Sequence, residues 1–261
     1  MTHPFTLADH RALVTGATKG IGRATVELFL ALGAEVLAVA RTAADLEAAA
    51  AEWSRAGVVS TCAADLATEA GRAAAVAAAG ERFGGGRPLT TLVNNVGTNI
   101  RKGVDEFGLD DLRRLTAVNV ESAFGLARAL KPALARADGA SVVNVSSVAS
   151  LEVVGLSTVG YAMTKGALDN LTRWLAVAWA PAGIRVNGVH PWYTRTELTA
   201  PLLERDALRE HVERATPLGR VAEAAEVAAA IAYLAMPAAG YVTGHGLVVD
   251  GGYRALGIAP L

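Results

Sequence analysis

A tyrosine and a lysine four residues apart carry the most specific chemistry in this chain. Tyr161 and Lys165 stand in the run 159–165 (VGYAMTK), which opens a helical pattern that continues through Trp179. Residues at i and i+4 share one face of a helix, so the phenol and the ammonium can point into one site. A nearby ammonium favours phenolate and lowers the phenol pKa from its usual value near ~10. The pair is therefore predicted to supply a proton donor for a carbonyl oxygen.

A glycine-rich loop follows the first β-type run and opens a helical pattern. Glycines permit a tight turn and a close approach of the backbone to phosphate, and a helix N-terminus offers free N–H groups. A glycine-rich turn can be only a turn, but a strand before it and a helix after it predict a dinucleotide site. The spacing is Gly-x-x-x-Gly-x-Gly, not G-x-G-x-x-G. The residues expected to contact the dinucleotide are Gly16, Thr18, Lys19, Gly20, Ile21 and Gly22.

The end of the second β-type run indicates which dinucleotide binds. An acidic residue there would bind the ribose 2′-hydroxyl of NAD, whereas arginine would accommodate the 2′-phosphate of NADP. This position is Arg41, with no acid beside it, and Lys19 can add a second positive charge. The guanidinium fork matches phosphate oxygens well. Although a solvated arginine at a strand end is the simpler interpretation, the glycine loop favours NADP(H) over NAD(H).

The elements that must position these residues alternate along the chain, which predicts an α/β protein with a doubly wound parallel sheet of about seven strands and helices on both faces. The expected strands are 12–15, 35–40, 58–63, 91–94, 141–145, 184–189 and 247–249. The expected helices are 20–32, 43–56, 68–83, 110–135, 160–180 and 223–236. The segment 192–217 is the longest without an expected strand, and we interpret it as a helical flap over the site.

Composition excludes several classes of function. The chain has 261 residues, 52% of them hydrophobic, so it can bury a sizeable core. A net charge of −1 without a basic run argues against nucleic acid or an anionic membrane as partner. The lone Cys62 excludes an internal disulfide framework and fits a reducing cytoplasm. No stretch predicts a signal peptide or a membrane-spanning helix.

Taken together, these residues resemble the short-chain dehydrogenase/reductase family, from Arg11 to about Gly252. Beside the glycine loop, the motifs that carry the resemblance are Asp65-Leu66, Asn94-Asn95-Val96-Gly97, Asn119, Ser146-Ser147, Tyr161-x-x-x-Lys165, Ile184-Arg185-Val186-Asn187 and Asp250-Gly251-Gly252. The runs 94–102 (NNVGTNIRK) and 191–196 (PWYTRT) are similar to the tropinone reductase-like branch. The resemblance implies a single Rossmann-type domain over residues 1–261.

The resemblance assigns the chemistry to four residues. It implies that Tyr161 protonates the carbonyl oxygen and that Lys165 lowers the pKa of Tyr161 and holds the nicotinamide ribose hydroxyls. Ser147 would hydrogen-bond the substrate oxygen and stabilise developing charge. Asn119 would anchor a water that passes protons to Lys165. The cofactor would carry the hydride chemistry, and the protein would position it.

Further contacts follow from the same resemblance. Asp65 would contact the adenine, Asn95 to Gly97 would line the adenosine ribose, and Thr196 would hold the nicotinamide side. The other expected cofactor contacts are Leu66, Val96, Pro191, Trp192 and Thr194, with Tyr161 and Lys165. The expected substrate contacts are Ser147, Tyr161, Trp192 and Tyr193, the last two because they follow a strand at the end where such sheets bind ligands.

Two positions depart from the family pattern. The family places the serine 13 residues before the tyrosine, whereas Ser147 and Tyr161 are 14 apart, so the loop between them carries one extra residue. Ser146 would be 15 away, which leaves Ser147 as the better candidate. The usual Pro-Gly after the sixth strand is Pro191-Trp192, which puts an indole beside the expected nicotinamide region.

Structural roles compete with several of these assignments. Ser147 could be a turn serine, and Asn119 could be a buried amide that ties elements together. Trp174 and Trp179 are interpreted as core or subunit-interface packing. His190 is interpreted as structural, and the five histidines show no ligand spacing, which argues against a catalytic metal.

The sequence thus predicts an NADPH-dependent reductase of a ketone or aldehyde on a small molecule. The alternatives are an NAD(P)-dependent dehydrogenase that oxidises a sugar, steroid or pathway alcohol, and a non-catalytic dinucleotide-binding protein. A serine hydrolase is disfavoured because Ser147 lies in no G-x-S-x-G elbow. The family also implies a homo-oligomer, a tetramer or a dimer, with one interface on helices 117–135 and 160–180. Specificity is expected in 148–160 and 192–214, where no charge cluster predicts the charge of the substrate.

Overall fold

Seven parallel strands form the centre of the protein in a computed structural model that describes residues 3–155 and 158–256. Their order is β3-β2-β1-β4-β5-β6-β9, and every pairing is parallel. The strands are β1 (Arg11–Thr15), β2 (Glu35–Ala40), β3 (Val59–Ala63), β4 (Thr91–Asn94), β5 (Ser141–Val145), β6 (Arg185–Pro191) and β9 (Gly246–Val249). The predicted doubly wound sheet is confirmed. The strand order reverses between β1 and β4, and ligands of such sheets bind at that switch point.

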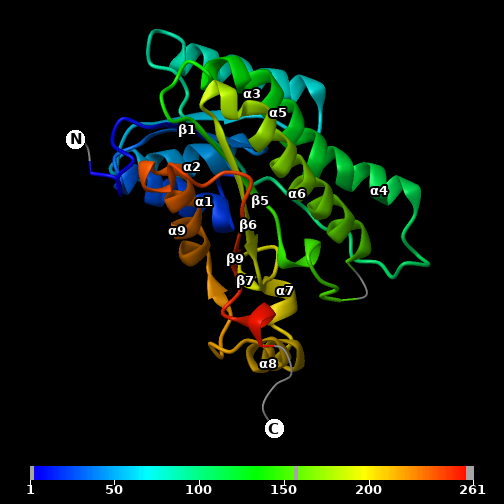
Figure 1. Cartoon of the computed structure of the whole chain (residues 1–261). Helices are drawn as coiled ribbons and strands as arrows, with labels where there is room; N and C mark the ends of the chain where they lie inside the picture. Colours follow the sequence, from blue (N-terminus) through cyan, green and yellow to red (C-terminus); the bar gives the residue numbers. More distant parts are fainter. Residues whose placement is uncertain (1–2, 156–157, 257–261) are drawn as a thin grey trace.

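Helices cover both faces of this sheet (Figure 1). The layer of α1 (Gly20–Ala31), α2 (Ala43–Trp53) and α9 (Ala224–Ala235) lies opposite the layer of α3 (Glu69–Phe83), α5 (Ser122–Leu134) and α6 (Val159–Trp179). The other helices are α4 (Leu109–Thr116), α7 (Ala200–Leu203) and α8 (Asp206–Ala215), with short 3₁₀ turns at Val148–Ser150, Ala180–Ala182, Pro237–Ala239 and Tyr253–Ala255. None of the helices in the described ranges combines the length and apolarity that a membrane span requires.

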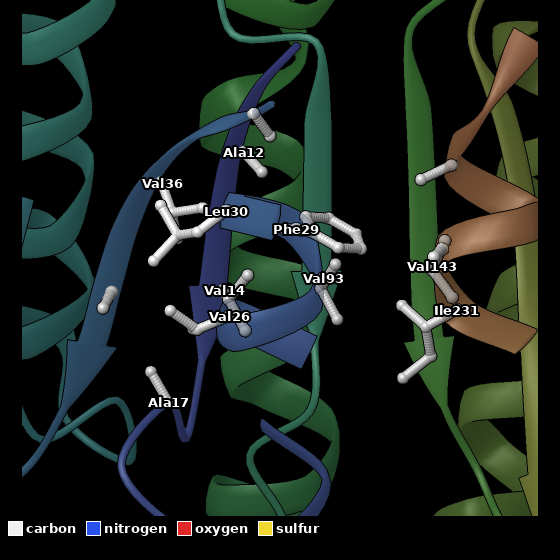
Figure 2. Packing of buried hydrophobic residues seen from close by; sticks show 14 of the residues in the cluster. Ala12, Val14, Ala17, Val26, Phe29, Leu30, Val36, Val93, Val143 and Ile231 are labelled. Carbon is white, nitrogen blue, oxygen red and sulfur yellow. The ribbon is translucent and has the colours of Figure 1, made fainter. Parts of the chain in front are cut away.

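The alternation of side chains along β1 builds two cores. Ala12 and Val14 point to the side of α1, where Phe29 packs against them, whereas Leu13 joins the opposite cluster. Figure 2 shows the first cluster, with α1 laid over β1 and Ile231 of α9 beside β5. Strands buried on both faces need apolar residues at every position, which explains the near-continuous hydrophobic runs that predicted them.

The predicted helix 110–135 is interrupted, which corrects the expectation of one regular helix. A π-helical turn, Ala117–Glu121, joins α4 to α5. Such turns shift the hydrogen-bond register and recur at functional sites. Hydrophobic spacing alone did not predict the interruption, because the apolar face continues across it. The buried residue of this turn is Asn119.

The sequence suggested that the segment 192–217 contains no strand, and the structure corrects this expectation. The two-residue strand β7 (Thr194–Arg195) pairs in parallel with β8 (Ala222–Glu223). The pairing joins the start of the flap to the start of α9. Between these strands lie the predicted helical pieces, α7 and α8, which project below the sheet in Figure 1.

Candidate active site

The carboxyl ends of six strands open into one cleft of about 1080 Å³. The glycine loop follows β1, Arg41 follows β2, Asp65 follows β3, and Ser147 follows β5. Nearly all of the predicted cofactor contacts line this cleft, namely Gly16, Thr18, Lys19, Gly20, Ile21, Arg41, Asp65, Leu66, Asn95, Val96, Gly97, Tyr161, Lys165, Pro191, Trp192, Thr194 and Thr196. The parallel sheet therefore collects residues from distant parts of the sequence at one edge.

The glycine loop has the geometry of a phosphate cradle. Gly16 and Gly20 have φ values of +63° and +50°, which side chains other than glycine rarely adopt. The helix that follows, α1, has no side-chain cap at its N-terminus. Its first N–H groups and positive dipole end are therefore available to an anion in the cleft. These features fit a dinucleotide pyrophosphate.

Gly22 does not line the cleft, although the sequence placed it among the cofactor contacts. A Cβ at this position would lie 2.1 Å from the Gly16 carbonyl oxygen and 2.5 Å from Asn95 Nδ2. The same Asn95 amide donates hydrogen bonds to the carbonyl oxygens of Thr15, at 2.9 Å, and Gly16, at 3.2 Å. Gly22 thus contributes by letting helix α1 pack against the loop and Asn95.

The two cations expected near the 2′-phosphate, Arg41 and Lys19, differ in whether they form an ion pair. Arg41 is exposed, lines the cleft and forms no ion pair among the residues that the structure describes. Lys19 Nζ instead lies 3.4 Å from Asp45 Oδ2, with 63% of the lysine side chain exposed. Part of the charge expected from Lys19 is therefore offset by this carboxylate. Arg41 remains as the free guanidinium fork at this position.

Ser147 and Tyr161 meet inside the cleft despite their longer spacing. The Ser147 Oγ accepts a hydrogen bond of 3.1 Å from the Ala149 amide, which orients it at the end of β5. Burial raises the pKa of the Tyr161 phenol, while a hydrogen bond with Ser147 and the positive charge of Arg101 act in the opposite direction. The net pKa lies above the usual value, so the phenol is held in its protonated form at neutral pH.

The predicted effect of Lys165 on this phenol pKa stays a prediction, and the structure shows where its ammonium lies. Lys165 Nζ lies 5.6 Å from the centre of the Tyr161 ring and donates a hydrogen bond of 2.6 Å to the Val145 carbonyl oxygen. The ammonium is therefore directed under the ring, towards the end of β5. Burial lowers the pKa of Lys165 to about 8, although the Asp169 carboxylate acts to raise it.

Asn119 ties three elements together beneath the cleft. Its Nδ2 donates to the Thr98 carbonyl oxygen and to Thr164 Oγ1, both at 2.9 Å, and its Oδ1 accepts from the Thr98 amide at 2.8 Å. Thr164 directly precedes Lys165 on α6. The side chain is buried and outside the lining of the cleft, so the structural role that the sequence also allowed is confirmed.

A buried hydrogen-bonded pair lies one helical turn beyond Lys165. Asp169 Oδ1 is 2.9 Å from His190 Nε2, and both side chains are nearly inaccessible to solvent. Burial raises the pKa of the Asp169 carboxyl, but hydrogen bonds with His190, Ser146 and Ser150 outweigh it, and the pKa ends below its usual value. The structural role expected for His190 is confirmed, and its carboxylate partner was not predicted.

The aromatic residues after β6 form a wall of the cleft. Trp192 stacks on Tyr253 with ring centres 3.8 Å apart, meets the edge of Tyr193 at 4.9 Å, and donates from Nε1 to Thr216 Oγ1 at 3.1 Å. Both residues line the cleft and pack against the small core of the flap. Their expected place in a pocket wall is confirmed.

Sequence reasoning missed several residues of the cleft. The most polar of these are Asp45, Arg101, Arg114, Glu197 and Arg205. Charged residues on loops and short helices show no periodicity, so only the folded arrangement brings them to the cleft. Residues 3–155 and 158–256 contain no group of three or more His, Cys, Asp or Glu side chains placed to hold a metal ion.

Comparisons with known proteins agree with this geometry. A family model described as Enoyl-(Acyl carrier protein) reductase matches residues 16–254. A tropinone reductase homolog of Arabidopsis thaliana is 41% identical over 256 residues, which cover 98% of this chain and 96% of the relative. The chain belongs to the short-chain dehydrogenase/reductase family. It is a nicotinamide-dependent oxidoreductase that acts on alcohol or carbonyl groups.

Solved structures of other short-chain dehydrogenase/reductases superpose closely on the chain. The Pseudomonas aeruginosa RhlG/NADP active-site complex is 32% identical, with a TM-score of 0.91 and coverage of 97% of this chain and 100% of that one. A gluconate 5-dehydrogenase from Burkholderia cenocepacia, in complex with NADP and tartrate, is 31% identical, with a TM-score of 0.90 and coverage of 97% and 98%. Both similar structures contain NADP.

Proposed function

We propose that the protein reduces a ketone or aldehyde of a small organic molecule to an alcohol with NADPH. The observation that carries the proposal is the meeting of Ser147 and Tyr161 inside the cleft, directly beside the lysine that hydrogen-bonds the end of β5. Burial keeps the phenol protonated, which a proton donor to a carbonyl oxygen requires. The reaction class follows from the family, and the direction of reaction is part of the proposal.

In the proposed mechanism, each side chain has a distinct role at the substrate oxygen. Nicotinamide, when bound, supplies hydride to the carbonyl carbon. The Ser147 hydroxyl donates a hydrogen bond to the carbonyl oxygen, and so stabilises the charge that develops there. Tyr161 transfers its phenolic proton to the same oxygen. Lys165 holds a positive charge beneath the ring below pH 8, and Asn119 fixes the loop and helix that carry these groups. A water relay from Asn119 to Lys165 is part of the proposal.

NADP(H) is the proposed cofactor, with NAD(H) as the weaker alternative. Arg41 follows β2, where a 2′-phosphate would lie, and has no ion-pair partner in the part of the chain that the structure describes. Lys19 is close by but shared with Asp45. The similar structures that contain NADP support the same choice.

The alternative is oxidation of an alcohol on a sugar-derived molecule. The resemblance to a gluconate 5-dehydrogenase favours it, because the same residues catalyse both directions and the cofactor ratio decides which dominates. A non-catalytic dinucleotide-binding role is disfavoured by the intact group of Ser147, Tyr161 and Lys165.

A carbonyl panel tests the proposal. The enzyme with NADPH is offered cyclic ketones, aldehydes and oxo acids, and an α,β-unsaturated thioester is included because the matching family model names an enoyl reductase. NADPH consumption with a carbonyl and not with the thioester is the expected result. Consumption with the thioester alone would replace the proposal by reduction of a carbon–carbon double bond.

We also propose that the protein is a homo-oligomer, a tetramer or a dimer. Large apolar side chains are exposed on α5 and α6, among them Phe124, Trp174 and Val177, the last two with 69% and 76% exposure. These helices are the expected interface, and Trp174 is too exposed to be core, whereas Trp179 is buried. Light scattering is expected to give a multiple of 26.8 kDa, and a monomer mass would refute the proposal.

A further inference from the structure

The lining of the cleft carries acidic residues and arginines on different segments of the chain. The acidic residues are Asp45 and Asp65, which follow β2 and β3, and Glu197, which directly precedes segment 198–208 and whose Oε2 is 3.4 Å from the Cβ that Gly20 lacks. The walls formed by segments 98–118, 147–155 and 198–208 contribute Arg101, Arg114 and Arg205 instead. In the described part of these segments, no carboxylate lines the cleft.

Close in the sequence to each of these arginines is another cation that forms an ion pair with a carboxylate. Lys102 pairs with Asp111 at 2.7 Å, Arg113 with Asp110 at 2.6 Å, and Arg209 with Asp206 at 2.6 Å. These pairs form on the surface and none of the six residues lines the cleft. By contrast, Arg101, Arg114 and Arg205 have no ion-pair partner among residues 3–155 and 158–256. These three guanidinium groups are therefore free to bind an anion that enters the cleft.

Arg101 is the arginine most directly connected to the reaction centre. Its Nη2 lies 3.5 Å from the Leu198 carbonyl oxygen, so the side chain spans from the loop after β4 to the flap. Its charge acts on the pKa values of both Tyr161 and Tyr193, which places it near both phenols. Arg101 is exposed and has no carboxylate partner among the described residues, so its guanidinium is suited to bind a carboxylate in a bidentate manner.

We infer that the substrate of this site is a carboxylate-bearing carbonyl or alcohol compound, and that Arg101 binds its carboxylate. Arg114 and Arg205 add to the positive potential that attracts the anion into the cleft. The inference rests on the proposed function, since it names the class of molecule whose carbonyl Tyr161 protonates. It also distinguishes this site from one that takes neutral or cationic ketones.

Kinetics with matched acids and esters test the inference. Oxo acids of three to six carbons and their methyl esters are compared in the wild type, in Arg101→Gln and in the control Arg113→Gln. We expect the wild type to prefer an acid over its ester at least tenfold in kcat/KM. Arg101→Gln should lower kcat/KM for that acid about ten- to a hundredfold more than for its ester, mainly through KM. Arg113→Gln should change neither.

Two kinetic results would overturn the inference. One is an ester used as well as its acid by the wild type, and the other is an equal loss for both in Arg101→Gln. Calorimetry with the NADP⁺-loaded enzyme tests the inference separately from the proposed function, because a binding measurement needs no turnover. There, hydroxy acids of three to six carbons, tartrate among them, are compared with their neutral amides, and failure of every acid to bind more tightly than its amide also refutes the inference. Binding of acids without any carbonyl turnover would refute the proposed function alone.

Discussion

The ammonium of Lys165 and the carbonyl oxygen of Val145 are joined by a hydrogen bond of 2.6 Å. Val145 is the last residue of β5, and Ser147 follows two residues later. The bond therefore fixes helix α6, which carries Tyr161, against the strand that carries the serine. It also buries the ammonium, and burial lowers its pKa to about 8.

The pKa of Lys165 predicts the alkaline limit of the reaction. The ammonium is charged below about pH 8 and loses its proton above it, whereas the raised pKa of Tyr161 keeps the phenol protonated through this range. We expect kcat/KM for carbonyl reduction to be constant up to about pH 8 and then to fall. In Lys165→Arg, whose guanidinium stays charged, the rate should be lower overall but the fall near pH 8 should disappear. A fall at the same pH in this variant would show that another group titrates there.

Asp169 should move this limit from one helical turn away. Its carboxylate acts to raise the pKa of Lys165, so Asp169→Asn should shift the alkaline limit to lower pH. A pH profile of Asp169→Asn that matches the wild type would show that the Asp169 carboxylate does not act on the pKa of Lys165. Asp110→Asn serves as the control, because the Asp110 side chain is 91% exposed and pairs with Arg113 on the surface.

The same pair of variants tests the stability of the buried Asp169–His190 contact. We expect Asp169→Asn to lower the free energy of unfolding by about 1–3 kcal/mol at pH 7, and Asp110→Asn to change it by less than about 0.5 kcal/mol. Because the folded-state pKa of Asp169 is depressed, this stability is present above pH ~4 and is lost as pH falls through the folded pKa. Urea unfolding at pH 7 and at lower pH measures it, and a difference between Asp169→Asn and wild type that does not shrink in acid would contradict the assignment.

Arg41 should determine the choice of cofactor. We expect Arg41→Ala to weaken NADPH binding about ten- to a hundredfold, with little change for NADH, because one charge-assisted contact to phosphate is lost. Lys19→Ala should have a smaller effect, since that ammonium already pairs with Asp45. Cofactor fluorescence titrations measure both, and an Arg41→Ala enzyme that keeps its preference for NADPH would remove the argument for this residue.

Gly22 should tolerate no side chain. An alanine Cβ would meet the Gly16 carbonyl oxygen at 2.1 Å, and backbone cannot move aside cheaply. We expect Gly22→Ala to destabilise the protein by about 1–3 kcal/mol and to weaken dinucleotide binding. Gly166→Ala on α6 is the matched control: nothing lies within 4 Å of its Cβ, so alanine should be neutral or stabilising by about 0.5–1 kcal/mol. Equal stability of the two variants would contradict this packing role.

The sequence predicted the sheet well because strands buried on both faces leave continuous apolar runs. It also predicted that Ser147, Tyr161 and Lys165 lie at one site, because the ends of parallel strands meet at one edge of the sheet. It failed where position depends on tertiary contacts. The direction of the Lys165 ammonium follows from the Val145 carbonyl oxygen, and the π-turn at Asn119 leaves no periodic signal.

The charge of the substrate pocket could not be predicted from the sequence, because it also depends on tertiary contacts. Arg101 and Arg114 lie in segment 98–118 and Arg205 lies in segment 198–208, and each has another charged residue within five positions. Which cations pair on the surface and which face the cleft is decided by the fold. The sequence therefore gave no basis for naming a substrate charge, whereas the arrangement in space does.

Turnover by Tyr161→Phe tests the central claim most directly. The variant loses only the phenolic oxygen, so it should keep the fold and bind NADPH as the wild type does, which calorimetry checks. With any carbonyl compound that the wild type reduces, we expect kcat to fall at least about a hundredfold, the lower range for loss of a general acid. Reduction by Tyr161→Phe at the wild-type rate would contradict the assignment of Tyr161 as the proton donor.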